Sequence, residues 1–218
     1  MKKKKERRLF VLSLLSLVLF LILTAALCFV DSRPIGPSGS EVGLAGVNGA
    51  FTSFSGVHLS LYTVTDWLGI LPILIAFCYF CLGLFQWFRR KRILLVDRSI
   101  LMLGAFYCLV MLVFVLFEAF PLNFRPVLIE GRLEASYPSS TTLLFISVMS
   151  TAAIELRQRI KRRSLSVLLT SVFCLLVIFA VIARLFSGVH WLTDIVGGAL
   201  LSTWLVLGYA YFMKKFAV

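Results

Sequence analysis

A short stretch of the C-terminal third, RLFSGVHWLTD, places Arg184, His190 and Asp194 between two long apolar segments. Ionisable groups at membrane depth are costly, so by default they mark a functional site. His190 and Asp194 are four residues apart, so if a helix has begun there they share one face within hydrogen-bond distance. A carboxylate that holds one imidazole nitrogen leaves the other nitrogen free to act on a substrate. The spacing therefore predicts the oriented half of a nucleophile or base site, with Arg184 close to it.

A second polar stretch, PLNFRPVLIEGRLEASYPSSTT, contains Arg125 and then Ser139, Ser140 and Thr141 where the next apolar segment begins. Hydroxyl groups and free backbone N–H groups at a helix start form an anion site. Arginine side chains donate paired hydrogen bonds that suit phosphate. Together with the stretch around the histidine, these residues predict a phosphate-binding site.

The composition predicts the kind of protein that must position these residues. The chain has 218 residues, of which 60% are hydrophobic, and a mean hydropathy of +0.98. Soluble globular domains carry a smaller apolar share. The net charge of +12 is compatible with nucleic-acid binding, but the basic residues form short clusters between apolar runs, which is typical of membrane topology. We therefore expect an all-α polytopic membrane protein, with residues 1–218 forming a single membrane domain and no nucleic-acid partner.

Six segments are long or apolar enough to be transmembrane helices, each of about 20 residues. The fourth is the shortest and contains Ser, Thr and Glu155, so we expect it to pack inside a six-helix bundle. The predicted spans are Leu9–Val30, Leu68–Phe88, Ile100–Phe120, Thr141–Leu156, Leu165–Phe186 and Trp191–Met213.

The basic residues predict the orientation of the chain. MKKKKERR, FRRKRILLVDR, RQRIKRRS and the final KK hold six, five, five and two of the 22 Lys and Arg residues. The positive-inside rule then places both termini in the cytoplasm, with residues 1–8 as a basic cytoplasmic tail and 31–67 as an outer loop, mobile or folded over the outer surface. The first apolar run is too long for a signal peptide, so we expect an uncleaved helix. The site would lie on the extracytoplasmic face of the plasma membrane.

The polar residues resemble the motifs of the type 2 phosphatidic acid phosphatase superfamily, K-x6-R-P, P-S-G-H and S-R-x5-H-x3-D, in the same order. The third motif is matched from Ala183 to Asp194, with only the leading Ser replaced. The resemblance covers roughly residues 68–218 and implies a phosphatase-like core over 68–213. It further implies phosphoester hydrolysis through a phosphohistidine, without a metal or other cofactor. The implied roles are nucleophile for His190, its orienting partner for Asp194, and phosphate binding for Arg125, Arg184, Ser139, Ser140 and Thr141.

Two positions depart from the family motifs. Glu118 stands where the first motif has Lys, and Thr141 stands where the second has His. That histidine protonates the leaving oxygen in the family mechanism, and general acid catalysis typically contributes ~10²–10⁴-fold. Threonine is a poor proton donor, but a leaving group that is already stable needs none. The departure therefore favours a lipid diphosphate, from which a phosphate monoester leaves, over a lipid monophosphate.

Three other residues are relevant to the Lys and His that the family motifs have and this sequence lacks. His58 either replaces the missing acid or is a surface or interfacial histidine. Arg132 either replaces the missing Lys or is a solvated charge paired with Glu130 or Glu134. Glu118 either faces the site, where it would repel phosphate, or pairs with an arginine at a helix end.

The sequence supports three hypotheses. The first is an integral membrane lipid phosphatase that acts at the outer leaflet on a lipid phosphate or diphosphate. Undecaprenyl diphosphate is the first substrate to test, followed by phosphatidic acid and phosphatidylglycerol phosphate. The second is a catalytically impaired family member that binds a phospholipid headgroup or a partner protein. The third is phosphotransfer to an acceptor other than water, or transport.

Overall fold

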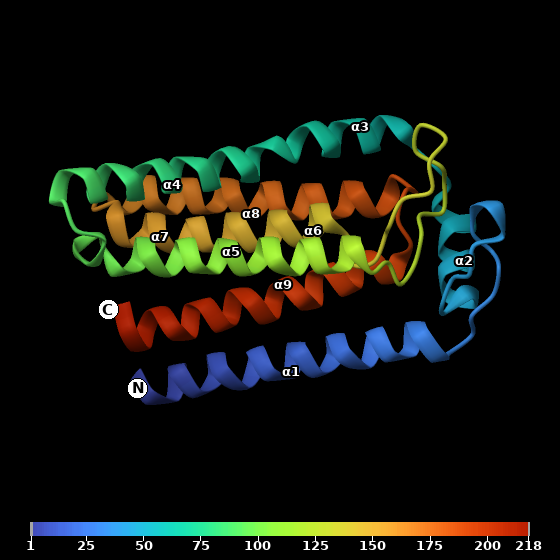
Figure 1. Cartoon of the computed structure of the whole chain (residues 1–218), viewed down its shortest axis with the longest axis horizontal. Coiled ribbons are helices and arrows are strands. Elements are labelled where there is room, and N and C mark those ends of the chain that lie inside the picture. The colour runs from blue at the N-terminus through green and yellow to red at the C-terminus, as the bar shows by residue number, and fades with distance from the viewer. Residues whose placement is uncertain (1, 218) are drawn as a thin grey trace.

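The computed structural model describes residues 2–217, and its long helices lie side by side along one direction (Figure 1). Within this range there is no β-strand; three isolated β-bridges lie in the loops. The α-helices are α1 (Lys2–Phe29), α2 (Ala45–Ser55), α3 (Leu59–Leu68), α4 (Ile70–Arg90), α5 (Arg98–Ala119), α6 (Ser140–Leu144), α7 (Ser150–Arg159), α8 (Arg163–Phe186) and α9 (Leu192–Phe212). Short 3₁₀ turns form at Pro37–Gly39 and Ile93–Leu95, and π-helical turns form at Phe145–Met149 and Met213–Ala217.

Five helical segments of the described chain are long and apolar enough to cross a membrane. They are Lys3–Phe29, Leu59–Arg90, Arg98–Ala119, Arg163–Phe186 and Leu192–Phe216. The predicted all-α, polytopic membrane class is therefore confirmed. The number of crossings and the side on which the termini lie stay predictions.

The fourth predicted span forms one helical rod, Ser140–Arg159, because α6 and α7 are joined through the π-helical turn. The rod lies between α5 and α8 in Figure 1, inside the bundle as its composition suggested. Its Glu155 is fully buried: one carboxylate oxygen accepts a hydrogen bond of 2.8 Å from the Tyr209 hydroxyl, and the other lies 3.3 Å from Arg159 Nε. Arg159 of the same rod thus offsets the charge of Glu155, and Tyr209 of α9 supplies a hydrogen bond, in a segment too polar to face lipid.

Two boundaries differ from the sequence-based expectations. The basic stretch expected as a tail forms, in its described part, the first turns of α1, so the helix extends beyond its apolar run. The segment expected as an outer loop contains α2 and α3, which pack on α9 and α8. Of the two alternatives for this segment, the structure shows the folded one. Helix α3 also continues almost directly into α4, so the helical segment begins at Leu59, nine residues before the predicted start of the second span at Leu68.

Close packing joins α1, α9 and the loop before α6. Ser13 and Ser16 of α1 donate hydrogen bonds of 3.0 and 2.9 Å to backbone carbonyl groups of α9. The Tyr137 ring is 1% exposed, and its hydroxyl lies 2.7 Å from Thr24 Oγ1. The hydroxyl end of the same ring lies against Gly197, where a β-carbon would be 2.5 Å from Tyr137 Cε2. Gly197 therefore allows the close approach of α9 to the loop that carries part of the candidate site.

Replacing Gly197 with alanine should destabilise the bundle. The added methyl group would force the Tyr137 ring to shift, and overpacking of this kind costs about 1–3 kcal/mol. We expect the Tm of the Gly197→Ala protein in detergent to fall by about 2–10 °C. Gly104→Ala is the matched control, because a β-carbon at this helical glycine of α5 meets nothing within 4 Å. A Tm that is equal in the two variants would contradict the packing described here.

Candidate active site

The turn between α8 and α9 presents His190. Gly188 lies in this turn at φ +71°, a conformation that L side chains rarely adopt, and a β-carbon there would collide with the carbonyl oxygen of Gly56. The backbone N–H of His58 donates a hydrogen bond of 2.9 Å to the carbonyl of Ser187. The junction between α2 and α3 therefore covers the turn and fixes its shape.

His190 and Asp194 face each other at the start of α9. The helix begins at Leu192, so His190 lies just before it, yet His190 Nδ1 is 3.4 Å from Asp194 Oδ2. The same carboxylate oxygen accepts a 2.8 Å hydrogen bond from the backbone N–H of Trp191. The carbonyl of Asp194 accepts a hydrogen bond of 3.0 Å from the backbone N–H of Ser139. Asp194 thus positions the imidazole and joins the histidine turn to the start of α6.

Two arginines approach the same place from different elements. Arg184, in the last turn of α8, is 2% exposed and donates a 3.1 Å hydrogen bond to Thr65 Oγ1. Its guanidinium carbon lies 4.8 Å from the centre of the Tyr62 ring, and that of Arg125 lies 6.0 Å from the same ring. Arg125 Nη2 is 3.2 Å from Glu134 Oε2. Helix α3 therefore supplies an aromatic ring that both guanidinium groups approach.

Three buried guanidinium N–H positions at this place have no hydrogen-bond partner among the described residues: Arg125 Nε and Nη1, and Arg184 Nε. His190 Nε2 is also unpaired. Buried polar groups are normally paired, so a group of unpaired donors requires an explanation. A ligand with several acceptor oxygens and a negative charge would satisfy them. The structure thus gathers donors for an anion around the imidazole.

The surroundings of His190 keep its ring neutral. Burial lowers the pKa of His190 well below the ordinary value of 6.5, and the positive charges of Arg184 and Arg125 lower it further. A neutral imidazole retains the lone pair that a nucleophile needs. The geometry and the charge distribution therefore suit attack by His190 on an anion that the arginines hold.

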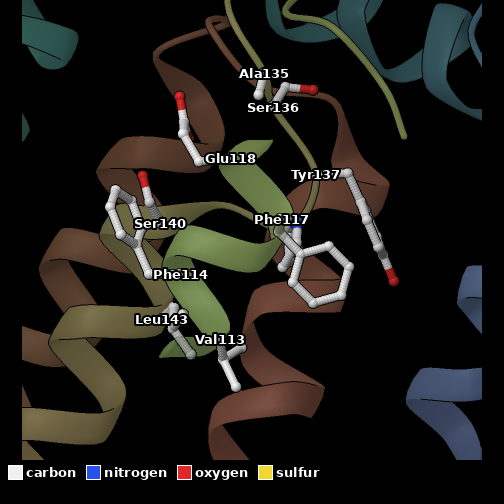
Figure 2. Close-up of a pocket in the computed structure, with 10 residues that line it drawn as sticks. Val113, Phe114, Phe117, Glu118, Ala135, Ser136, Tyr137, Ser140 and Leu143 are labelled. Carbon is white, nitrogen blue, oxygen red and sulfur yellow. The ribbon is translucent and has the colours of Figure 1, made fainter. Parts of the chain in front are cut away.

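The three hydroxyl residues expected in the site, at the start of α6, differ in burial and in what they contact. Ser139 is fully buried, caps the helix and accepts a 3.4 Å hydrogen bond at Oγ from the backbone N–H of Thr142. Ser140 lines a small pocket beside Glu118 and Ser136 (Figure 2). Thr141 is half-buried in the first turn of α6. Ser139 is thus connected to Asp194 through the backbone, whereas Ser140 faces a neighbouring hollow.

Sequence reasoning missed two residues of the site, Ser136 and Tyr62. Ser136 is 2% exposed; its hydroxyl lies beside the Asp194 carboxylate and its backbone carbonyl beside the His190 ring. Tyr62 lies near both arginines and comes from a segment expected to be a loop. The position of Ser136 just before the Pro138-Ser139 motif was a signal that could have indicated it. For Tyr62 the spacing of the sequence gives no such signal.

Comparison with known proteins identifies the C-terminal half of the chain. Residues 114–217 match the family model of the PAP2 superfamily. Over this segment the chain is similar to the PAP2 superfamily. The fold is also similar to the crystal structure described as the first transmembrane PAP2 type phosphatidylglycerolphosphate phosphatase from Bacillus subtilis, with a TM-score of 0.66 and 20% sequence identity. That similarity covers 94% of this chain and 96% of the other. No curated protein sequence matches.

Glu118, which stands where the first PAP2 motif has Lys, can now be placed. Glu118, at the end of α5, is exposed, and among the described residues it forms no ion pair with an arginine. The expected pairing of Glu118 is therefore wrong. Its side chain instead lines the pocket that Ser136 and Ser140 share (Figure 2). Glu118 thus lies near the edge of the site, where solvent screens its charge.

The two proposed replacements for the missing groups lie at the surface. His58 is exposed at the start of α3, where its Nε2 forms a 2.9 Å hydrogen bond with the carbonyl of Ser55. Arg132 is exposed in a turn closed by Ile129, while Glu134 pairs with Arg125 and not with Arg132. This geometry favours the surface interpretation for His58 and the solvated interpretation for Arg132.

The state of His190 can be measured directly, because the chain contains two histidines. In the His58→Ala protein, labelled with ¹⁵N-histidine and carrying no histidine tag, ring signals report His190 alone. We expect the ring to stay neutral as the pH falls well below 6.5, because burial and two positive charges disfavour the imidazolium. Arg125→Gln should move the titration upward, since one of those charges is removed. Titration near pH 6.5 in both proteins would show that the arginines do not act on this ring.

Proposed function

We propose that this chain hydrolyses a lipid phosphate or diphosphate at the outer leaflet of the plasma membrane, through a phosphohistidine. The contact between His190 and Asp194, beside buried arginine donors that lack a partner, is the observation that carries the proposal. The PAP2 superfamily match and the phosphatase fold support a lipid phosphatase in general. The leaflet, the lipid and the covalent intermediate are parts of the proposal.

In the proposed reaction, Nδ1–H of His190 is held by Asp194, and the lone pair on Nε2 attacks phosphorus. A bond forms between Nε2 and the terminal phosphorus as the bond from that phosphorus to the leaving oxygen breaks. The leaving oxygen is the lipid oxygen of a monophosphate or the bridging oxygen of a diphosphate. Arg125, Arg184 and Ser139 hold the phosphoryl oxygens, on which negative charge develops. Water then attacks the phosphohistidine, releasing inorganic phosphate and restoring the neutral imidazole. All of these steps use side chains of this chain and need no proton donor except at the leaving oxygen.

The lack of a proton donor for the leaving oxygen favours a diphosphate substrate. Thr141 cannot supply a proton as a histidine would, and a lipid alkoxide without a proton is a poor leaving group. When a lipid diphosphate is cut, the group that leaves is a phosphate monoester, which is stable as an anion because its second pKa is about 6. Undecaprenyl diphosphate is therefore the first substrate to test. Phosphatidic acid follows, as does phosphatidylglycerol phosphate, which the name of the similar Bacillus subtilis enzyme suggests.

An apolar groove supports a substrate with a long hydrocarbon tail. The groove runs between α4 and α5, has a volume of about 850 Å³, and is lined by Ile73, Phe77, Phe80, Trp87, Leu101 and Met111 among others. A smaller hollow of about 100 Å³ shares Ile73 and Met111 with it and reaches Leu144 of α6. Since Ser139 caps α6, the apolar path ends within about two helical turns of the proposed phosphate site.

The alternative is a catalytically impaired member that binds a phospholipid headgroup or a partner protein. Two observations favour it: a threonine stands where the family has its proton donor, and Glu118 adds negative charge near the pocket. Such a protein would keep the arginine donors for binding and would not turn over substrate. Turnover by the purified protein separates the two proposals.

Purified protein should release inorganic phosphate from lipid substrates without added metal, and His190→Ala should reduce release to the background without enzyme. The reason is that the substitution removes the proposed nucleophile. The matched control is His58→Ala, which removes the other histidine and should keep most of the activity, because His58 is exposed and hydrogen-bonded to backbone. The assay is phosphate release across a panel of lipid mono- and diphosphates. Equal release by the wild-type and His190→Ala proteins would refute the histidine mechanism.

Restoring a proton donor with Thr141→His should increase kcat on lipid monophosphates at least about tenfold and change kcat on diphosphates little. The gain is confined to monophosphates because only their alkoxide leaving group needs the proton. Thr141→Asn is the control, since it is polar and does not donate a proton as an acid. If neither the wild-type protein nor the Thr141→His variant turns over any substrate, the impaired alternative is supported instead.

A further inference from the structure

Basic side chains gather at the end of the bundle opposite the candidate site. The N-terminal turns of α1 and the turn after α9 meet there, as the neighbouring N and C labels in Figure 1 show. Lys5 and Lys214 lie beside each other. We call the group the terminal basic cluster; its members are Lys3, Lys4, Lys5, Arg7, Arg8, Lys214 and Lys215. No member forms an ion pair within residues 2–217.

An apolar groove begins next to this cluster. It lies between α1, α5 and α9 and has a volume of about 380 Å³. Its lining includes Phe10, Leu14, Met102, Leu109, Trp204 and Phe212. Further along, α1 closes against α5, where the ring centres of Phe20 and Phe117 are 6.0 Å apart. The groove, which we call the terminal groove, is therefore a gap between α1 and α5 confined to the half of the bundle that carries the cluster.

The chemistry of the two features is complementary to one kind of molecule. Adjacent ammonium groups at Lys5 and Lys214 repel each other, and Glu6 offsets part of this repulsion at Lys214. An anion between the two ammonium groups would offset it further. Lys215 Nζ lies 5.7 Å from the centre of the Tyr211 ring, and Tyr211 also lines the groove. Positive charge at the mouth and apolar side chains within match a negatively charged headgroup joined to a hydrocarbon chain.

We propose that the terminal basic cluster and the terminal groove together bind an anionic phospholipid of the leaflet at that end. Its phosphate lies between Lys5 and Lys214, and one acyl chain fills the gap between α1 and α5. The bound lipid holds α1 against the rest of the bundle, which α1 otherwise contacts chiefly through α9. This site is separate from the proposed catalytic site, since the two occupy opposite ends of the helices (Figure 1). Its occupant is a structural lipid and not a substrate.

Thermal unfolding of the full chain in lipid nanodiscs tests the proposal. The probe is dioleoyl phosphatidylserine, a phosphodiester that the proposed reaction neither consumes nor produces, compared with dioleoyl phosphatidylcholine. We expect phosphatidylserine to raise the Tm of the wild-type protein by several degrees. The double variant Lys5→Gln/Lys214→Gln should lose most of this increase, and Gly208→Leu, which fills the groove beside Ser13, should lose part of it.

The matched control removes the same charge elsewhere on the same end. Lys161 and Arg162 are exposed between α7 and α8 and form no ion pair within the described chain, so Lys161→Gln/Arg162→Gln should keep the full increase. Equal loss in the two double variants would mean diffuse surface attraction and would overturn the proposal. So would an equal Tm in both lipids, or an equal increase from inorganic phosphate in phosphatidylcholine nanodiscs. Because the readout is stability, the result does not depend on whether the chain is a phosphatase.

Discussion

Two guanidinium groups held close together inside an apolar bundle are the constraint on which the outer end of this fold depends. Arg184 is 2% exposed and has no carboxylate within ion-pair distance in the described chain, while Arg125 has one, Glu134. Burying charge without a full set of partners is unfavourable. The surrounding structure must therefore hold these side chains against their own repulsion. Thr65 and the Tyr62 ring on α3 do so through a hydrogen bond and a cation–π contact.

The elements around the arginines are linked by single, well-placed contacts. Asp194 joins α9 to the start of α6 through its backbone and holds His190 through its side chain. The indole N–H of Trp191 donates a 2.7 Å hydrogen bond to the carbonyl of Phe124, next to Arg125. Arg125 is thus connected to the histidine turn through the Trp191 indole and the backbone of Phe124. Such preorganisation allows the donors to meet an anion without rearranging.

Sequence alone predicted the part of this site that depends on short-range geometry. The spacing of Arg184, His190 and Asp194 is enough, because one helix end, a turn at Gly188 and one helix start fix where three side chains can point. The hydrophobic runs likewise predicted the long helices, since a span must satisfy its own backbone hydrogen bonds. Both inferences use only the periodicity of neighbouring residues.

The remaining features depend on contacts between distant segments, which one sequence does not reveal. Tyr62 meets Arg184 across more than a hundred residues, and only the packing of α3 on α8 brings them together. The helix at Leu59 was missed because polar and apolar residues alternate there, and its stability comes from tertiary packing. The expected pairing of Glu118 with an arginine was wrong for the same reason, because it too depended on contacts between separate segments; Arg125, for example, pairs with Glu134.

The two departures from the PAP2 motifs affect different parts of the proposed reaction. Glu118 affects phosphate binding, and Thr141 affects protonation of the leaving group. Glu118 is exposed, so water and salt screen its repulsion of phosphate, whereas the buried arginines act through a medium of lower dielectric. Anion binding therefore tolerates the change at Glu118. The change at Thr141 is not screened in this way, because the proton a histidine would deliver has no electrostatic substitute. In the proposed reaction the protein supplies no proton to the leaving oxygen, so the substrate must have a leaving group that is stable as an anion.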